Sequence, residues 1–108
     1  MADRHTGIPS PALEGIKDVF GRHPDIWRAT LYGSRAKGTH RSGSDIDLVL
    51  TAPELTWEEF NKVVSEIDDL LLPWKVDLAL EHQIENQDLL DHIQRVGVVV
   101  YRSGTAGG

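Results

Sequence analysis

The sequence contains no cysteine in its 108 residues, which excludes several classes of protein at once. Disulfide-stapled scaffolds, thiolate zinc sites and cysteine nucleophiles all need a residue type that is missing here. Disulfides belong to oxidising compartments, so their exclusion fits a cytoplasmic protein, and we expect that location.

Long apolar runs and an excess of basic residues are missing too. No stretch approaches the roughly 18 apolar residues of a membrane-spanning helix, and residues 1–11 lack the apolar centre of a secretion signal. Lys and Arg number 11 against 17 Asp and Glu, for a net charge of −6. Because nucleic-acid-binding surfaces are usually basic, this balance argues against nucleic acid as a partner.

What remains is the composition of one small globular domain. The length suits a single domain, and 40% hydrophobic with 26% charged residues is ordinary for a packed protein. We expect an N-terminal extension over residues 1–11, a domain over residues 12–102 and a flexible tail of small residues over 103–108.

Hydrophobic periodicity predicts helices and strands in alternation. The expected helices cover residues 12–21, 35–37, 56–71 and 86–96, and the expected strands cover 27–32, 46–50, 75–80 and 98–101. Ser10 is expected to cap the first helix, and Thr56 with Glu59 to form a capping box. This order predicts an α/β (α+β) fold, with a mixed β-sheet flanked by helices and a strand order left open.

An Asp-x-Asp pair at the start of a strand is the first chemical signal. Asp45 and Asp47 are two residues apart, and strand side chains alternate, so both carboxylates project to one face. Two such close carboxylates repel each other unless a cation lies between them. A hard divalent ion, bound by carboxylates and substrate phosphates, meets that need.

A third acid, Asp77, is the lone carboxylate in an otherwise apolar strand. A neighbouring strand could bring it beside Asp45 and Asp47. Three carboxylates can hold two metal ions in phosphoryl chemistry, and Asp77 could also accept the proton of an attacking hydroxyl.

Gly33-Ser34 follows a predicted strand and opens a short helical segment. Glycine lets the backbone approach a ligand closely, and the N–H groups that begin a helix bind phosphate. Arg35 and Lys37 add positive charge beside it. Together with the acids, the segment predicts a site for a metal–triphosphate.

These motifs resemble the signature of the polymerase β-like nucleotidyltransferase superfamily. Gly33-Ser34, ten residues and then Asp45-x-Asp47 match its spacing, and residues 72–78 look like the strand of its third carboxylate. The ending over residues 93–101 is similar to its terminal helix and strand, so the resemblance covers about residues 12–102. Within the superfamily, the short chain resembles the minimal nucleotidyltransferases of the type paired with a HEPN-like helical partner.

The resemblance implies the polymerase β-like fold, a metal site and a nucleotide site. Mg²⁺ is implied, as two ions, with Mn²⁺ as the alternative. The catalytic and metal-binding residues would be Asp45, Asp47 and Asp77, and the nucleotide- and phosphate-binding residues would be Gly33, Ser34, Arg35 and Ser44.

The implied reaction moves a nucleoside monophosphate, AMP from ATP, to a hydroxyl of a partner protein or a small molecule. Such a protein can be the antitoxin of a HEPN/MNT-type pair. The chain is too short to carry the helical domain with which larger relatives hold an acceptor, so a separately encoded partner is expected. Homo-oligomer formation stays open.

Two other functions compete with this interpretation. One is a catalytically idle module that binds nucleotide or occludes a toxin, although retention of all three acids favours activity. The other is a nucleotide sensor without turnover. A polynucleotide polymerase fits poorly, since the chain has no room for a template domain.

Some individual residues also have alternative roles. Ser34 could be only a helix cap, Arg35 a surface salt-bridge residue and Ser44 a turn residue. Trp57 and Trp74 are expected to pack, or to belong to a partner surface. The histidines show no zinc spacing and are expected at the surface: His5, His23, His40, His82 and His92.

Overall fold

Four short strands form one mixed sheet in a computed structural model that describes residues 7–38 and 43–103. The order is β3-β2-β1-β4, and the strands are β1 (Arg28–Tyr32), β2 (Ile46–Thr51), β3 (Val76–Leu80) and β4 (Val98–Arg102). β1 is antiparallel to β2 and β4, whereas β2 and β3 are parallel. The expected mixed sheet is confirmed, and the structure supplies the strand order that the sequence did not predict.

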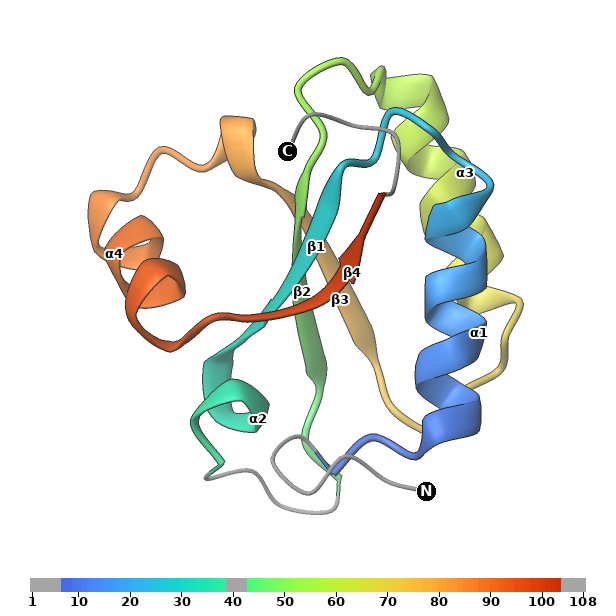
Figure 1. Cartoon of the computed structure of the whole chain (residues 1–108), viewed down its shortest axis with the longest axis horizontal. Helices are drawn as coiled ribbons and strands as arrows, with labels where there is room; N and C mark the ends of the chain where they lie inside the picture. The colour runs from blue at the N-terminus through green and yellow to red at the C-terminus, as the bar shows by residue number, and fades with distance from the viewer. Residues whose placement is uncertain (1–6, 39–42, 104–108) are drawn as a thin grey trace.

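Helices cover the two faces of this sheet unequally. They are α1 (Ser10–Gly21), α2 (Gly33–Lys37), α3 (Trp57–Asp68), the 3₁₀ helix η1 (Glu81–Gln83) and α4 (Gln87–Val96). α1 and α3 lie side by side on one face, and α4 lies on the other with the short α2 nearby (Figure 1). None of the helices in the described part of the chain is long and apolar enough to span a membrane. The alternation of helices and strands is as predicted, apart from η1.

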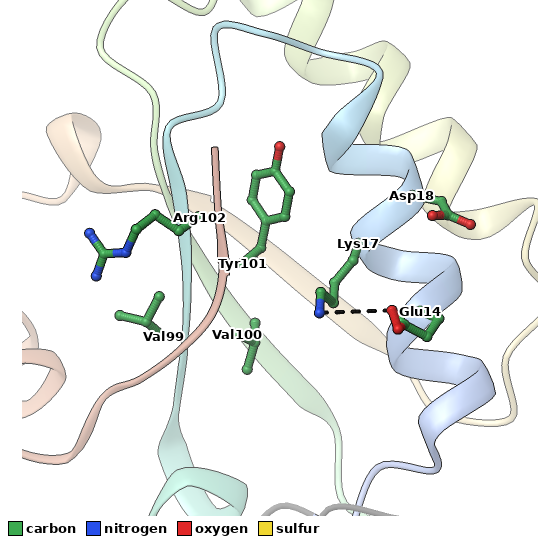
Figure 2. Close-up of a pocket in the computed structure, with 7 residues that line it drawn as sticks. All are labelled: Glu14, Lys17, Asp18, Val99, Val100, Tyr101 and Arg102. Carbon is green, nitrogen blue, oxygen red and sulfur yellow. Dashed lines mark ion pairs between the residues drawn. The ribbon is translucent and has the colours of Figure 1, made fainter. Parts of the chain in front are cut away.

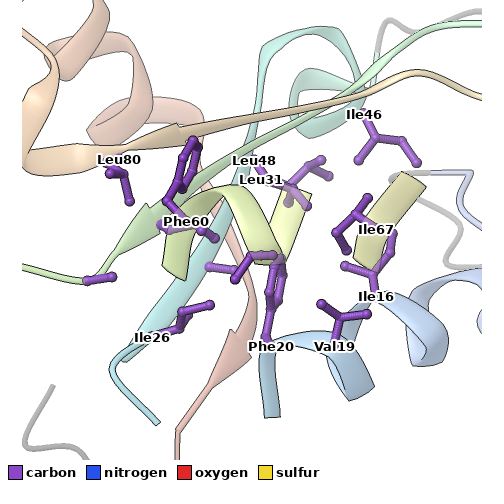
Figure 3. Packing of buried hydrophobic residues seen from close by; sticks show 14 of the residues in the cluster. Ile16, Val19, Phe20, Ile26, Leu31, Ile46, Leu48, Phe60, Ile67 and Leu80 are labelled. Carbon is purple, nitrogen blue, oxygen red and sulfur yellow. The ribbon is translucent and has the colours of Figure 1, made fainter. Parts of the chain in front are cut away.

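The main hydrophobic core lies between the sheet and the α1–α3 pair. β2 contributes Ile46, Leu48 and Leu50, which alternate along the strand and are at most 1% exposed. They meet Phe20 of α1 and Phe60 of α3 in one cluster (Figure 3). Full burial of side chains this large contributes roughly 1.5–3 kcal/mol each, so this face supplies most of the stability.

The opposite face has a smaller apolar layer. Val49 of β2 and Ile93 of α4 are buried there, outside the main cluster. α4 contacts β1 and α2, and does not cover the whole sheet (Figure 1). The alternation that points Leu48 into the core turns Asp47 to this second face.

The start of α1 differs from the prediction. The helix begins at Ser10, and Pro9 occupies the N-cap position without a side-chain cap hydrogen bond, so the expected Ser10 cap is wrong. Ile8, expected in the N-terminal extension, is 1% exposed and belongs to the core. The remaining extension (residues 1–6), the tail from residue 104, His5 and His40 lie outside the described residues.

One histidine prediction is also wrong. His23 follows α1, is 7% exposed and is held by two glutamates of α3. Its Nδ1 lies 2.8 Å from Glu59 Oε2, and its Nε2 lies 3.1 Å from Glu66 Oε2. The Thr56 hydroxyl caps α3 by accepting from the Glu59 N–H, while the Glu59 carboxylate contacts His23 and Lys62. Glu59 therefore links α3 to the segment that follows α1.

Candidate active site

Pairing between β2 and β3 brings two of the predicted acids together. Asp47 and Asp77 are register partners in these parallel strands, so their side chains leave the same face of the sheet. Adjacent strands lie about 4.8 Å apart, which makes the two carboxylates close neighbours. Asp45 directly precedes β2 and is exposed. Two acids are therefore fixed by a β-ladder, and the third lies on a loop.

The electrostatics of this cluster show mutual repulsion. The pKa of Asp47 is raised, first by burial and then by the negative charges of Asp77 and Asp45. Lys75 counters it, with its Nζ 3.5 Å from Asp77 Oδ1, but the Lys75 side chain is 70% exposed and that of Asp77 is 46% exposed, so water screens the pair. The cluster is therefore short of positive charge close to Asp47.

A divalent cation fits that deficit. Among the described residues, no group of three His, Cys, Asp or Glu side chains is arranged to hold a metal as it stands. Mg²⁺ that works with nucleotides usually takes only one or two carboxylates, and phosphates and water complete its shell. Asp45 and Asp47 suit that kind of site.

Gly33 ties the predicted phosphate segment to the same acids. Its φ is +76°, and a Cβ atom at this position would lie 2.7 Å from Asp47 Oδ2. Only glycine tolerates both the backbone angle and the contact. The turn into α2 therefore passes directly against the Asp47 carboxylate.

Ser34 lies inside α2, one residue after Gly33. The N-cap position belongs to Tyr32, so the alternative of Ser34 as a helix cap is wrong. Tyr32 is the register partner of Asp47 on β1. Burial raises its pKa, and the charges of Asp47 and Asp77 add to the shift. Tyr32, Asp47 and Asp77 thus form one row across three strands.

Arg35 and Ser44, both predicted phosphate ligands, contact each other. Arg35 is 1% exposed, and its Nε and Nη2 donate to the Ser44 carbonyl oxygen at 3.1 and 2.9 Å. The guanidinium carbon lies 5.5 Å from the centre of the Trp74 ring. Burial lowers the pKa of Arg35, and the charge of Asp45 partly opposes this. The alternative of a surface salt-bridge residue is therefore wrong for Arg35.

Sequence reasoning missed three residues at this site: Tyr32, Lys75 and His92. His92 of α4 stands edge-on to the Tyr32 ring, with ring centres 6.5 Å apart. Alternation along β1 and β3 could have placed Tyr32 on the acidic face. No sequence signal pairs it with His92, which lies 60 residues later in the chain.

A separate hollow of about 490 Å³ lies between α1 and β4 (Figure 2). An ion pair lies along its α1 wall, with Lys17 Nζ 3.8 Å from Glu14 Oε2. None of the three candidate acids lines it, and its lining residues are Glu14, Lys17, Asp18, Val99, Val100, Tyr101 and Arg102. It is therefore distinct from the acidic cluster.

Solved structures share this fold. A toxin–antitoxin structure with AMP-PNP superposes with a TM-score of 0.67 and 20% identity, covering 85% of this chain and 74% of that one. A structure of a tri-AMPylated Shewanella oneidensis HEPN toxin in complex with MNT antitoxin gives 0.63 and 17%, covering 86% and 71%. At these identities the likeness establishes the fold alone.

Sequence comparison supplies the family. The chain is 31% identical over 97 residues to the probable protein adenylyltransferase MntA of Haemophilus influenzae, covering 86% of this chain and 82% of that protein. The family model described as "Polymerase beta, Nucleotidyltransferase" matches residues 14–105. These residues contain Gly33 and all three acids. The chain therefore belongs to the polymerase beta nucleotidyltransferase family.

Proposed function

We propose that this protein transfers AMP from ATP to a hydroxyl group of a separately encoded, helical HEPN-like protein, and so acts as the antitoxin of that pair. The observation that carries the proposal is the row in which Asp47 lies beside Asp77, with Gly33 against its carboxylate. The name of the Haemophilus relative and the AMPylated toxin in the Shewanella complex support the choice of AMP and of a protein acceptor.

Members of this family use divalent metal ions. Here Asp45 and Asp47 would hold two Mg²⁺ ions, with Asp77 as a further ligand. Mn²⁺ could take the place of Mg²⁺. The metal would neutralise charge on the triphosphate and on the leaving group. Gly33 and Ser34 would bind the triphosphate, because the turn at Gly33 lies against the Asp47 carboxylate that would hold the metal.

The chain's own residues account for the remaining steps. The acceptor oxygen attacks the α-phosphorus, the bond from that phosphorus to the bridging oxygen breaks, and pyrophosphate leaves. Asp77 would accept the proton of the acceptor hydroxyl. Its side chain is 46% exposed at the edge strand β3, so an acceptor on another protein can reach it.

Label transfer tests the proposal. The protein is incubated with Mg²⁺ and ATP labelled at the α- or the γ-phosphate, with and without its proposed HEPN-like partner. A partner band labelled from α-labelled ATP alone is the expected result. Label from γ-labelled ATP would indicate phosphate transfer instead, and no label from either would contradict the proposal.

A matched pair of variants assigns that label to the site. Asp47→Asn should abolish labelling, since it removes a metal ligand with almost no change in shape. Asp69→Asn, in an exposed position just after α3, is the control and should label as the parent does. Equal labelling by both variants would exclude Asp47 from the reaction.

A further inference from the structure

The buried guanidinium of Arg35 needs a physical explanation. A charged group at 1% exposure is costly unless it is hydrogen-bonded and its charge is balanced. Here the Ser44 carbonyl accepts two of its N–H groups, at 3.1 and 2.9 Å, and the Trp74 ring lies under the cation at 5.5 Å. A guanidinium makes both kinds of contact, whereas a lysine ammonium lacks the planar fork.

These contacts join three segments of the candidate site. Arg35 itself belongs to α2, two residues after Gly33. Ser44 directly precedes Asp45, and Trp74 lies three residues before Asp77. The two strand entrances also meet directly, because the Ile46 N–H donates to the Lys75 carbonyl at 2.8 Å.

The three acids differ in what holds them. Asp47 and Asp77 are register partners within the β2–β3 ladder. Asp45 lies before β2, is exposed and is the residue after the carbonyl that Arg35 binds. We infer that Arg35 is a positioning residue that sets Asp45 relative to Asp47 by holding Ser44, with Trp74 fixing the guanidinium.

This role differs from direct phosphate binding, and Arg35→Lys separates the two. Lysine keeps the positive charge that a phosphate ligand needs, but it loses the paired contacts with Ser44 and the flat stacking on Trp74. Replacing a residue that orients a metal ligand typically lowers metal affinity about tenfold or more. We therefore expect Arg35→Lys to weaken Mg²⁺-dependent ATP binding about tenfold.

Trp74 gives a test that does not alter Arg35 itself. Trp74→Phe keeps an aromatic face under the guanidinium, whereas Trp74→Leu removes it. Trp57→Leu is the matched control, because Trp57 is 64% exposed and its ring packs on Phe60. These variants keep the result interpretable if Arg35→Lys fails to fold.

The experiment measures calorimetric binding of ATP in a Mg²⁺ titration, a parallel Mn²⁺ titration without nucleotide, and the thermal midpoint of every variant. We expect weaker metal and metal–ATP binding for Arg35→Lys and Trp74→Leu, near-parent binding for Trp74→Phe, and parent binding for Trp57→Leu. Parent-like binding by Trp74→Leu, or a loss for Trp74→Phe equal to that for Trp74→Leu, would overturn the inference.

The inference uses the proposed function only through the assignment of a metal–nucleotide site, and its readout is binding. If the parent protein binds metal and ATP but labels no acceptor, the proposed transfer is contradicted and the binding test of Arg35 still applies. If the parent protein labels its partner and Trp74→Leu binds metal and ATP as the parent does, only the role given to Arg35 is contradicted.

Discussion

The two faces of the sheet are built from the same strands and differ in what they bury. Toward α1 and α3, alternate residues of β2 such as Leu48 are sealed in one apolar cluster. On the other face, Asp47 lies between Tyr32 and Asp77, and its raised pKa records both burial and repulsion. Strand periodicity therefore places a side chain that stabilises the fold next to one whose charge the fold disfavours.

Within the six residues of β2, the side chains on one face therefore stabilise the fold, and those on the other face serve the chemistry. The apolar face gains free energy from every side chain that it buries. The acidic face loses some, because charges of one sign are gathered without an equal number of close partners. Substitutions on the two faces should then have opposite effects on folding and on activity.

The largest expected effect is the loss of AMP transfer in Asp47→Asn, by several orders of magnitude. Stability should not fall with it. The folded state raises the pKa of Asp47, so it disfavours the charged form, and a neutral amide removes that penalty. The free energy of unfolding should stay the same or rise by up to about 1 kcal/mol. Urea denaturation at neutral pH measures this, and a fall of more than about 1 kcal/mol would mean that Asp47 stabilises the fold.

Phe20→Ala makes the opposite change. Phe20 is fully buried, and its ring lies 5.7 Å from that of Tyr101, so truncation leaves a cavity in the main core. A loss of about 3–5 kcal/mol in the free energy of unfolding is expected. Val99→Ala on edge strand β4 is the control, because Val99 is 44% exposed and should change stability by less than about 1 kcal/mol. Equal losses in the two variants would contradict the division between the faces.

Local sequence patterns predicted the elements and the acidic pair well, for a physical reason. Asp45 and Asp47 are two residues apart, and alternation in a strand is a short-range property of the backbone. Gly33 could be assigned a close approach because glycine tolerates positive φ. What it approaches, the Asp47 carboxylate, depends on the β1–β2 pairing.

Long-range contacts were the part that the sequence could not supply. His23 is buried because Glu59 and Glu66 lie 36 and 43 residues away on α3, which no periodicity encodes. Arg35 was predicted as a phosphate ligand or a surface salt-bridge residue, and its buried contacts with Ser44 and Trp74 were not predicted. In each case a charged or polar residue is buried by partners from another element, which overrides its usual preference for the surface.

Gly33→Ala should lower both stability and nucleotide binding, by an intermediate amount. A non-glycine residue at positive φ costs about 1–2 kcal/mol, and the added methyl group would push Asp47 Oδ2 from its place. Nucleotide binding in a Mg²⁺ titration should weaken together with stability. Gly21→Ala is the control, because a Cβ there meets no atom within 4 Å and alanine favours the helix. Unchanged binding in Gly33→Ala would show that the position of Asp47 beside this turn is unimportant.

The smallest expected effect concerns the pH dependence of stability on the α1–α3 face. The pKa of Glu59 is lowered from its ordinary value of 4.5, first through its hydrogen bond with His23 and then through Lys62. A carboxyl with a lowered pKa in the folded state stabilises the fold above its unfolded pKa, and this contribution is lost as pH falls through the folded value.

Glu59→Gln should therefore flatten the fall in stability below about pH 4.5 and lower stability at neutral pH. Thermal melts from pH 3 to pH 7 measure it, with Glu58→Gln in the exposed position beside it as the control. A parent and a Glu59→Gln variant with parallel profiles across that range would show that the contact with His23 holds the segment after α1 to α3 by shape and not by charge.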